Sequence, residues 1–264
     1  MKVLFVGDIF GKPGRMVASE YIPKMIEKHS VDFCIVNGEN TAGGYGITEN
    51  CIKKLKSYGV DAITSGNHIW DRREAESLLN AYPELMRPAN YPYGCPGVGD
   101  YLAELPNGLK IGVMNLQGRI FMPPIDCPFR TADNVLNYLR DETNIIIVDF
   151  HAEATSEKMA LAWHLDGRVS AVLGTHTHVM TADEKILPHG TAFISDVGMT
   201  GPHKSIIGVR PEQSLRRIIK QLPTRFSPAE EWLTFSAVLL DIDDESGQAI
   251  SISRICERKD DLPK

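Results

Sequence analysis

Polar side chains that could bind a metal ion or transfer a proton follow the ends of several apolar segments. They comprise two acids, two amides and four histidines: Asp8, Glu39, Asn40, Asn67, His68, His151, His176 and His178. Carboxylate, amide and imidazole groups are ligands for iron, manganese or zinc, and no cysteine belongs to the set. We therefore expect these side chains to form a shared metal site.

The size of this set predicts two metal ions. A single zinc ion needs only three or four ligands. Seven or eight candidates suit two ions roughly 3.5–4 Å apart with a carboxylate between them. Taken alone, each motif has a simpler interpretation, since Asp8 could cap a helix and most histidines lie at the surface or bond within the core. The prediction depends on five such clusters at successive strand ends. Iron is the expected metal, with manganese or zinc as alternatives.

The elements that must position these groups alternate between strands and helices. We expect helices over residues 11–28 and 49–57, and a third that begins near Asp71. The expected strands are 3–6, 32–37, 61–64, 110–115, 145–150, 169–173, 192–195, 235–241 and 249–254. Open α/β sheets bind ligands beyond the carboxyl ends of their strands, and the candidate residues lie at those ends. The last two strands predict an antiparallel hairpin.

The chain is expected to form a single domain over residues 1–264. Half of its sixteen prolines fall within residues 83–128, which predicts a loop-rich excursion over about 83–130. The sequence contains no internal repeat, low-complexity tract or linker that would divide it. The composition, with 43% hydrophobic and 23% charged residues, is typical of a globular protein.

Charge and cysteine content narrow the partners and the location. A net charge of −6 argues against binding to duplex nucleic acid. The lysines and arginines are dispersed along the sequence, so no basic patch is expected that would support RNA binding. No apolar segment approaches the roughly 18 residues of a membrane span, and the five scattered cysteines predict reduced thiols. We therefore expect a cytoplasmic protein without a membrane partner, and a homo-oligomer remains an open alternative.

The order of the motifs resembles that of the calcineurin-like metallophosphoesterases. Over residues 8–178 the chain presents Gly-Asp, Gly-Glu-Asn, Gly-Asn-His, a strand-terminal His and Gly-Thr-His-Thr-His. The glycine-rich segment after Glu39, residues 151–158 and residues 196–202 are similar to the bacterial YmdB-type branch, a similarity that covers nearly the whole chain. The resemblance implies an α/β fold, specifically a four-layer α/β/β/α sandwich.

Three positions depart from the usual superfamily pattern. Phe10 stands where a histidine ligand is common, and Glu39 replaces a bridging aspartate. Ile69 follows Gly-Asn-His in place of an acid, with Asp71 two residues further on. The YmdB-type branch accommodates all three departures, and the resemblance offers Asn40 as a substitute for the missing histidine.

The resemblance also implies a role for each candidate residue. Glu39 would bridge the two ions. The first ion would be held by Asp8 and His178 together with Asn40, and the second by Asn67, His151 and His176. A metal-bridging hydroxide would attack phosphorus while His68 assists the leaving oxygen as a hydrogen-bond or proton donor. Residues 43–46 and 197–202 are expected to line the pocket, with Arg119 and Arg130 as candidate contacts for an anion.

The expected function is a dinuclear metal-dependent phosphodiesterase acting on small phosphodiesters, with 2′,3′- or 3′,5′-cyclic nucleotides as the family expectation. One alternative is a phosphomonoesterase or phosphoprotein phosphatase on the same metal core, which the relative turnover of bis-p-nitrophenyl phosphate and p-nitrophenyl phosphate would distinguish. A second alternative is a regulatory nucleotide- or RNA-associated binding protein with vestigial activity. Nucleotide binding without hydrolysis in a fully metallated sample would favour it.

Overall fold

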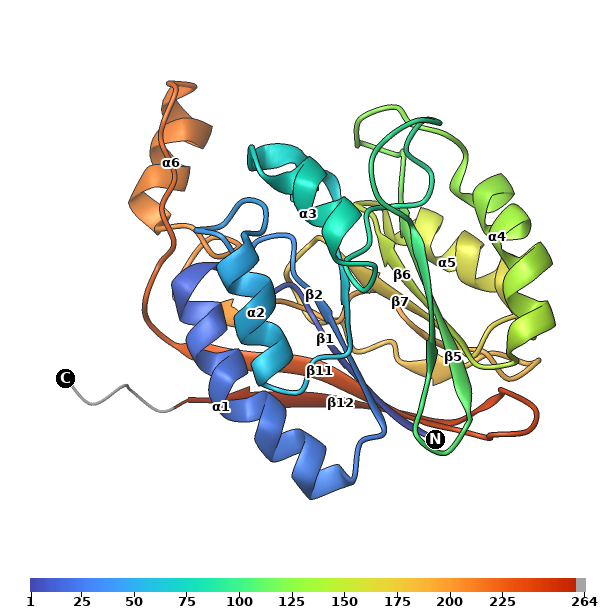
Figure 1. The fold of residues 1–264 in the computed structure, drawn as a ribbon. Coiled ribbons are helices and arrows are strands. Elements are labelled where there is room, and N and C mark those ends of the chain that lie inside the picture. The colour runs from blue at the N-terminus through green and yellow to red at the C-terminus, as the bar shows by residue number, and fades with distance from the viewer. Residues whose placement is uncertain (260–264) are drawn as a thin grey trace.

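The computed structural model describes residues 1–259 and contains two sheets stacked face to face (Figure 1). The first sheet has the strand order β10-β11-β1-β2-β3, and β12 pairs with β11. Its strands are β1 (Lys2–Val6), β2 (Phe33–Asn37), β3 (Ala62–Thr64), β10 (Gly201–Pro202), β11 (Leu233–Ile242) and β12 (Ala249–Arg258). β1, β2 and β3 are parallel, so their carboxyl ends meet at one rim.

The second sheet has the order β4-β5-β6-β7-β9-β8. Its strands are β4 (Asp100–Glu104), β5 (Lys110–Gln117), β6 (Ile146–His151), β7 (Ala171–Thr175), β8 (Lys185–Ile186) and β9 (Ala192–Ile194). β5, β6, β7 and β9 run parallel, while β4 and β8 lie antiparallel at the two edges.

Helices cover the outer face of each sheet, with α1 and α2 on the first and α4 and α5 on the second (Figure 1). A short 3-10 helix, η1, leads into α3 above the rim, and α6 projects from the body beside it (Figure 1). The helices are α1 (Gly11–His29), α2 (Glu49–Ser57), η1 (Asn67–Asp71), α3 (Ala75–Ala81), α4 (Pro128–Glu142), α5 (Thr155–Leu165) and α6 (Pro211–Lys220).

Side-chain alternation along the strands explains the layers. In β1, Phe5 packs between the two sheets, whereas Leu4 and Val6 pack against the helices of the first sheet. In β6, Ile147 points between the sheets and Phe150 faces the helices of the second sheet. Successive side chains of a strand point to opposite faces, so sheets buried on both faces must be apolar throughout. The expected four-layer α/β/β/α sandwich is confirmed.

The predicted strands match observed strands, with shifts at their ends, and the β11–β12 hairpin is confirmed. The helix expected to begin near Asp71 begins at Ala75, because residues 67–71 form the 3-10 helix η1. The segment 83–130 is only partly loop, since it contains β4 and β5. Within residues 1–259, no helix is both long enough and apolar enough to cross a membrane.

Candidate metal centre

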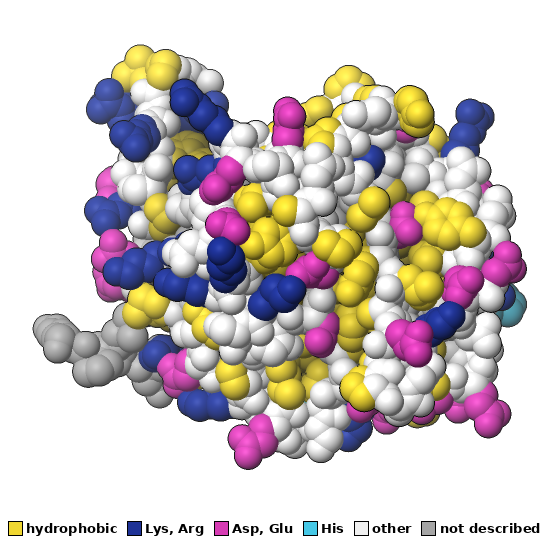
Figure 2. Space-filling view, in the orientation of Figure 1, with side chains coloured by type: hydrophobic (Ala, Val, Ile, Leu, Met, Phe, Trp, Pro, Cys, Tyr) yellow, Lys and Arg dark blue, Asp and Glu magenta, His cyan; other side chains and the backbone are white. Residues whose placement is uncertain are grey.

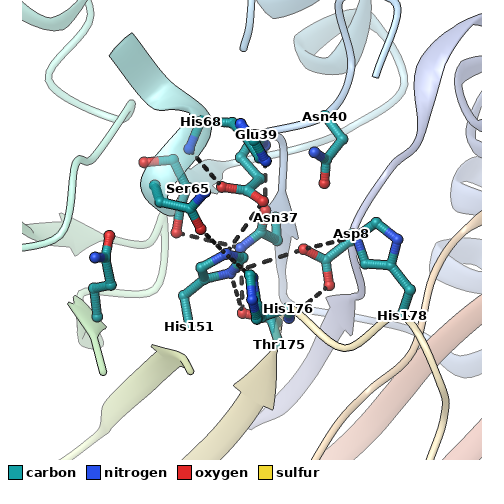
Figure 3. A network of polar contacts seen from close by, with 12 residues as sticks. Asp8, Asn37, Glu39, Asn40, Ser65, His68, His151, Thr175, His176 and His178 are labelled. Carbon is teal, nitrogen blue, oxygen red and sulfur yellow. Dashed lines mark hydrogen bonds and ion pairs between the residues drawn. The ribbon is translucent and has the colours of Figure 1, made fainter. Parts of the chain in front are cut away.

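All the candidate side chains lie at the rim where the parallel strands of both sheets end, and Figure 3 labels each of them except Asn67. The first sheet supplies the residues that follow β1, β2 and β3: Asp8, Glu39, Asn40, Asn67 and His68. The second sheet supplies the histidines at the ends of β6 and β7: His151, His176 and His178. The carboxylates and amides therefore come from one sheet and the strand-end imidazoles His151, His176 and His178 from the other.

Glu39, His151 and His176 form the tightest group, with one potential ligand atom from each within 4.8 Å of the others. Nε2 of His151 lies 3.1 Å from a carboxylate oxygen of Glu39 and 3.0 Å from Nδ1 of His176. Oδ1 of Asn67 lies 3.3 Å from the same His151 nitrogen. A carboxylate, an amide oxygen and two imidazoles thus converge on one small volume.

Asp8 and His178 border a second position beside this group. Oδ1 of Asp8 lies 4.0 Å from Nε2 of His178 and 3.8 Å from Nδ1 of His151. The other Asp8 oxygen accepts a hydrogen bond from the backbone N–H of His176 at 3.2 Å. Nδ1 of His178 lies 2.9 Å from the carbonyl of Ile207, so it carries the proton and Nε2 is left with a lone pair toward Asp8.

Two buried oxygens at this rim accept no hydrogen bond from residues 1–259: Oδ1 of Asp8 and Oδ1 of Asn40. Asp8 is 0% exposed and Asn40 is 2% exposed. The Asn40 amide is oriented by its own N–H group, which donates to the carbonyl of Gly44 at 2.9 Å. Because an unpartnered buried oxygen is costly, oxygens of this kind indicate a group that the polypeptide does not supply. Carboxylate and amide oxygens beside imidazoles fit a metal ion.

The charges of the ionisable groups at the rim also indicate a site for a cation. Burial raises the pKa of Asp8, with nearby carboxylates adding to the effect. Burial alone would lower the pKa of His151, but Glu39 and Asp8 reverse this and raise it to about 9. Burial likewise opposes ionisation of Glu39, yet His151 outweighs it and lowers the pKa of Glu39 to about 2. Negative charge is therefore concentrated here, and the site favours a cation.

His176 is held in its neutral form. Burial, with a further contribution from neighbouring His151, lowers the pKa of His176 to about 3. Its Nε2 lies 3.2 Å from the carboxylate of Glu153, which leaves Nδ1 directed toward His151. Burial also lowers the pKa of His178. Neutral imidazoles present the lone pair that metal coordination requires.

A buried chain of hydrogen bonds fixes the orientation of His151. Its Nδ1 lies 2.9 Å from the hydroxyl of Thr175, and that hydroxyl donates to Asp149 at 2.8 Å. The hydroxyl therefore accepts the Nδ1 proton, and Nε2 faces Glu39, where a bound metal ion would displace the second proton of the ring. Asn37 and Thr64 also donate to Asp149, so this carboxylate is fully enclosed by donors. Such outer partners tune and orient metal ligands.

The loop that carries His176 and His178 has an unusual backbone. Both residues have positive φ, 101° and 65°, a conformation that costs energy without glycine. Asp196 holds the loop by accepting from the N–H and the hydroxyl of Thr177 at 3.0 and 2.8 Å. Lys158 in turn donates to Asp196 at 2.8 Å, and both side chains are buried. The contacts of Asp196 therefore fix the loop in the conformation that directs the two imidazoles to the rim.

Gly66 permits the close approach of the two sheets. A Cβ atom there would lie 2.1 Å from Cδ2 of His151 and 2.4 Å from a carboxylate oxygen of Glu39. Any side chain would therefore displace both groups.

His68 is held beside the group of Glu39, His151 and His176 by three contacts. Its backbone N–H donates to Glu39 at 3.1 Å, and its Nδ1 lies 2.8 Å from the carboxylate of Asp71. The rings of Tyr45 and His68 pack in a T-shaped arrangement, with their centroids 5.0 Å apart. Asp71, two residues after Ile69, is therefore the acid that contacts His68, one turn further along η1.

A cavity of about 530 Å³ opens from this rim toward α6. Phe10 lines this cavity, at the sequence position where a histidine is usual. Its ring packs against that of His178, with the two centroids 5.5 Å apart. Of the expected glycine-rich turn, Gly44 and Tyr45 line the cavity. The opposite wall comes from α6 and the loop that follows, which include Arg217, Gln221 and Phe226.

One expectation about this cavity is wrong. Residues 197–202 are buried behind the site and do not line the cavity, because Gly198 and its neighbours pack against the strand-end loops. Arg119 borders a separate cavity next to α5, and Arg130 does not line this one. The sequence pattern did not predict α6 or the roles of Asp149 and Thr175. The spacing of Ser214, Arg217, Ile218 and Gln221 was a detectable signal, since it places all of them on one helix face.

The fold and the rim together define a metallophosphoesterase-type α/β protein. A profile of the YmdB-like protein family matches residues 4–255, so the chain belongs to that family. The 2′,3′-cyclic-nucleotide 2′-phosphodiesterase of Bacillus subtilis (strain 168) is 50% identical over 262 residues, covering 99% of each chain.

Two solved structures are similar over almost their whole length. A hypothetical protein from Thermus thermophilus superposes with a TM-score of 0.93 at 42% identity, covering 98% of this chain and 100% of that one. A novel phosphatase from Mycoplasma pneumoniae gives a TM-score of 0.92 at 34% identity, covering 99% and 94%.

Proposed function

We propose that this chain is a metal-dependent phosphodiesterase, in a single domain spanning residues 1–264, that opens nucleoside 2′,3′-cyclic phosphates to nucleoside 3′-phosphates. The observation that carries the proposal is the pair of unpartnered buried oxygens of Asp8 and Asn40 among imidazoles, at the end of a cavity of about 530 Å³. The 50% identity to the Bacillus subtilis enzyme supports the substrate class.

The side chains suit two metal ions with Glu39 between them. One position is bordered by Asp8, Asn40 and His178, and the other by Asn67, His151 and His176. Metal ions bound there would supply the positive charge that acidifies water and neutralises phosphate oxygens. The mixed oxygen and nitrogen ligands fit iron, manganese or zinc, and iron is the metal we propose.

His68 is positioned to assist the leaving group. In the reaction a water oxygen forms a bond to phosphorus, the bond from phosphorus to O2′ breaks, and O2′ takes up a proton. The His68 ring lines the cavity, and the carboxylate of Asp71 accepts its Nδ1 proton, so the doubly protonated ring would donate the second proton from Nε2 to O2′. General acid assistance of this kind typically contributes about 10²–10⁴-fold to the rate.

The test measures metal content and reaction product together. Untagged protein is analysed for metals and incubated with 2′,3′-cyclic AMP, and ³¹P NMR identifies the product. We expect two metal equivalents and 3′-AMP, with a sharp loss of both in Glu39→Gln. Glu104→Gln, an exposed site on β4, is the matched control.

Other results would overturn the proposal. If the protein remains metal-free and inactive after loading with iron or manganese, it is not a metal-dependent hydrolase, and a nucleotide- or RNA-binding role would be favoured instead. Formation of 2′-AMP would contradict cleavage at O2′. Faster turnover of p-nitrophenyl phosphate than of bis-p-nitrophenyl phosphate would indicate a phosphomonoesterase, and 3′,5′-cyclic AMP is assayed in parallel as the other cyclic substrate.

A further inference from the structure

The helix α6 is the wall of the catalytic cavity that extends farthest from the body of the protein (Figure 1). Ser214, Arg217, Ile218 and Gln221 share the face that lines the cavity. Arg217 also packs over the ring of Phe226, with its guanidinium carbon 5.5 Å from the ring centroid. A cavity of about 530 Å³ suits a ligand of mononucleotide size. One end of that ligand would meet the metal centre and the other would meet α6.

Positive charge continues from the cavity around α6. Lys220 follows Arg217 by three residues and Arg216 precedes Lys220 by four, so these side chains are neighbours on the helix surface. Arg225 lies in the loop just before Phe226. All four cations are exposed, and none forms an ion pair with any residue in 1–259. Figure 2 shows dark blue side chains gathered where α6 projects from the body.

This cluster corrects the expectation that lysines and arginines are dispersed. The basic side chains on either side of this cluster do have acidic partners, Lys204 with Glu231 and Arg210 with Glu230. On α6 itself the one acidic side chain is Glu212 in the first turn. A protein with a net charge of −6 therefore presents an unneutralised basic arm beside its catalytic cavity.

We propose that the preferred substrate is the 3′ end of a short single-stranded RNA that terminates in a 2′,3′-cyclic phosphate. The inference rests on the proposed function and extends it. The terminal nucleotide occupies the cavity, and its 5′ oxygen continues into the preceding phosphodiesters. The basic arm, defined here as Arg216, Arg217, Lys220 and Arg225, binds those phosphates. Phosphates attract lysine and arginine without regard to sequence, so the arm would act on any RNA sequence.

The exposed apolar side chains of the arm are compatible with this ligand. Leu215, Ile219 and Leu222 are 47%, 72% and 44% exposed. Nucleotides present both charged phosphates and flat apolar base faces, and the arm offers a surface for each. The chemistry at the terminus is unchanged: water adds to phosphorus, the bond to O2′ breaks, and the RNA retains a 3′-phosphate.

The experiment compares the value of kcat/KM for 2′,3′-cyclic AMP with that for a tetranucleotide RNA ending in a 2′,3′-cyclic phosphate. We expect the RNA to be preferred at least tenfold at low salt. Three phosphate contacts to a single strand predict a fall in RNA binding of roughly twentyfold between about 50 and about 200 mM salt. The mononucleotide lacks the internucleotide phosphates, so its KM should depend much less on salt.

The variant Arg216→Gln/Lys220→Gln/Arg225→Gln removes the outer charges of the arm. We expect the ratio of the two kcat/KM values to fall about tenfold, largely through KM for the RNA. Lys2→Gln/Lys28→Gln/Lys54→Gln is the matched control, because these exposed lysines lie at the opposite end of the first sheet and its helices. Circular dichroism establishes that both variants fold.

The outcomes separate this inference from the proposed function. Hydrolysis of 2′,3′-cyclic AMP with no preference for the RNA would overturn the inference and leave the function intact. If neither substrate is hydrolysed, fluorescence anisotropy of the labelled tetranucleotide decides, since absence of arm-dependent binding overturns the inference. Arm-dependent binding to vesicles of anionic lipid, without RNA preference, would assign the arm to a membrane surface instead.

Discussion

A carboxylate oxygen of Asp71 lies 2.8 Å from Nδ1 of His68, three residues earlier in the same 3-10 turn. The contact fixes which His68 nitrogen faces the cavity. It also separates proton transfer from metal binding, because neither residue is among the proposed metal ligands. Substitutions at these two positions should therefore affect the rate without emptying the metal centre.

For His68→Ala we expect metal content close to that of the parent and a fall in kcat of about 10²–10⁴-fold, the usual contribution of a positioned general acid. Asp71→Asn should cause a smaller fall, because the ring remains but loses its charged partner. Elemental analysis and steady-state kinetics on 2′,3′-cyclic AMP make the measurement. Full activity in His68→Ala would remove this residue from the mechanism.

Thr175→Val tests the buried chain behind His151. The substitution preserves shape but removes the acceptor for Nδ1 and the donor to Asp149. Loss of such an outer partner typically weakens metal affinity by about 10–100-fold. Competition with a chelator measures the affinity, and urea denaturation measures stability.

Thr191→Val is the matched control for Thr175→Val. Thr191 is equally buried, and its hydroxyl donates to the backbone carbonyl of Val169 at 2.7 Å, away from the rim. We expect it to lose stability but retain metal affinity. Equal metal affinity in the two variants would show that the Thr175 hydroxyl does not support the site.

Lys158→Met should destabilise the protein by about 3–5 kcal/mol, because it leaves the buried Asp196 carboxylate without its cation. The double variant Lys158→Met/Asp196→Asn should recover part of that loss, since it removes the unpaired charge. Urea denaturation of both proteins measures the difference. A double variant as unstable as the single one would show that the charge pairing is not the origin of the effect.

Gly66→Ala should reduce both metal content and activity, because the added carbon would collide with His151 and Glu39. Gly112→Ala is the matched control, since the carbon added there would meet flexible Leu139 and Ile146 side chains at 3.4 Å or more. Elemental analysis of the two purified variants is sufficient. Normal metal content in Gly66→Ala would contradict the close packing at this position.

The position of the rim could be predicted because each of its polar residues directly follows a strand in the sequence. Each apolar strand ends in a polar residue, as Asp8 follows β1 and His151 ends β6, and parallel strands bring such ends together. Which atoms meet across the two sheets depends on packing between distant segments, so the Asp149–Thr175–His151 chain could not be read in advance. Asp149 itself is a single acid within the apolar segment of β6.

The basic arm could not be predicted from the sequence for a different reason. Ser214 is the buried residue of α6, so burial does not select a face of this helix as it does for α2 or α4. The basic residues 216–225 are close in sequence, yet their significance depends on the cavity beside them, which only the tertiary structure reveals.

The two carboxylates Asp8 and Glu39 come from the first sheet, and the histidines that surround them come from the second. Neither sheet alone therefore supplies the complete set of candidate ligands, so the centre is complete only where the two sheets pack together. Any cation bound at the rim would stabilise the packing of the two sheets against each other. Heat or denaturant should therefore release the cation when the sheets separate. A chain reduced to one sheet with its helices would therefore keep some of the candidate ligands but not the complete centre.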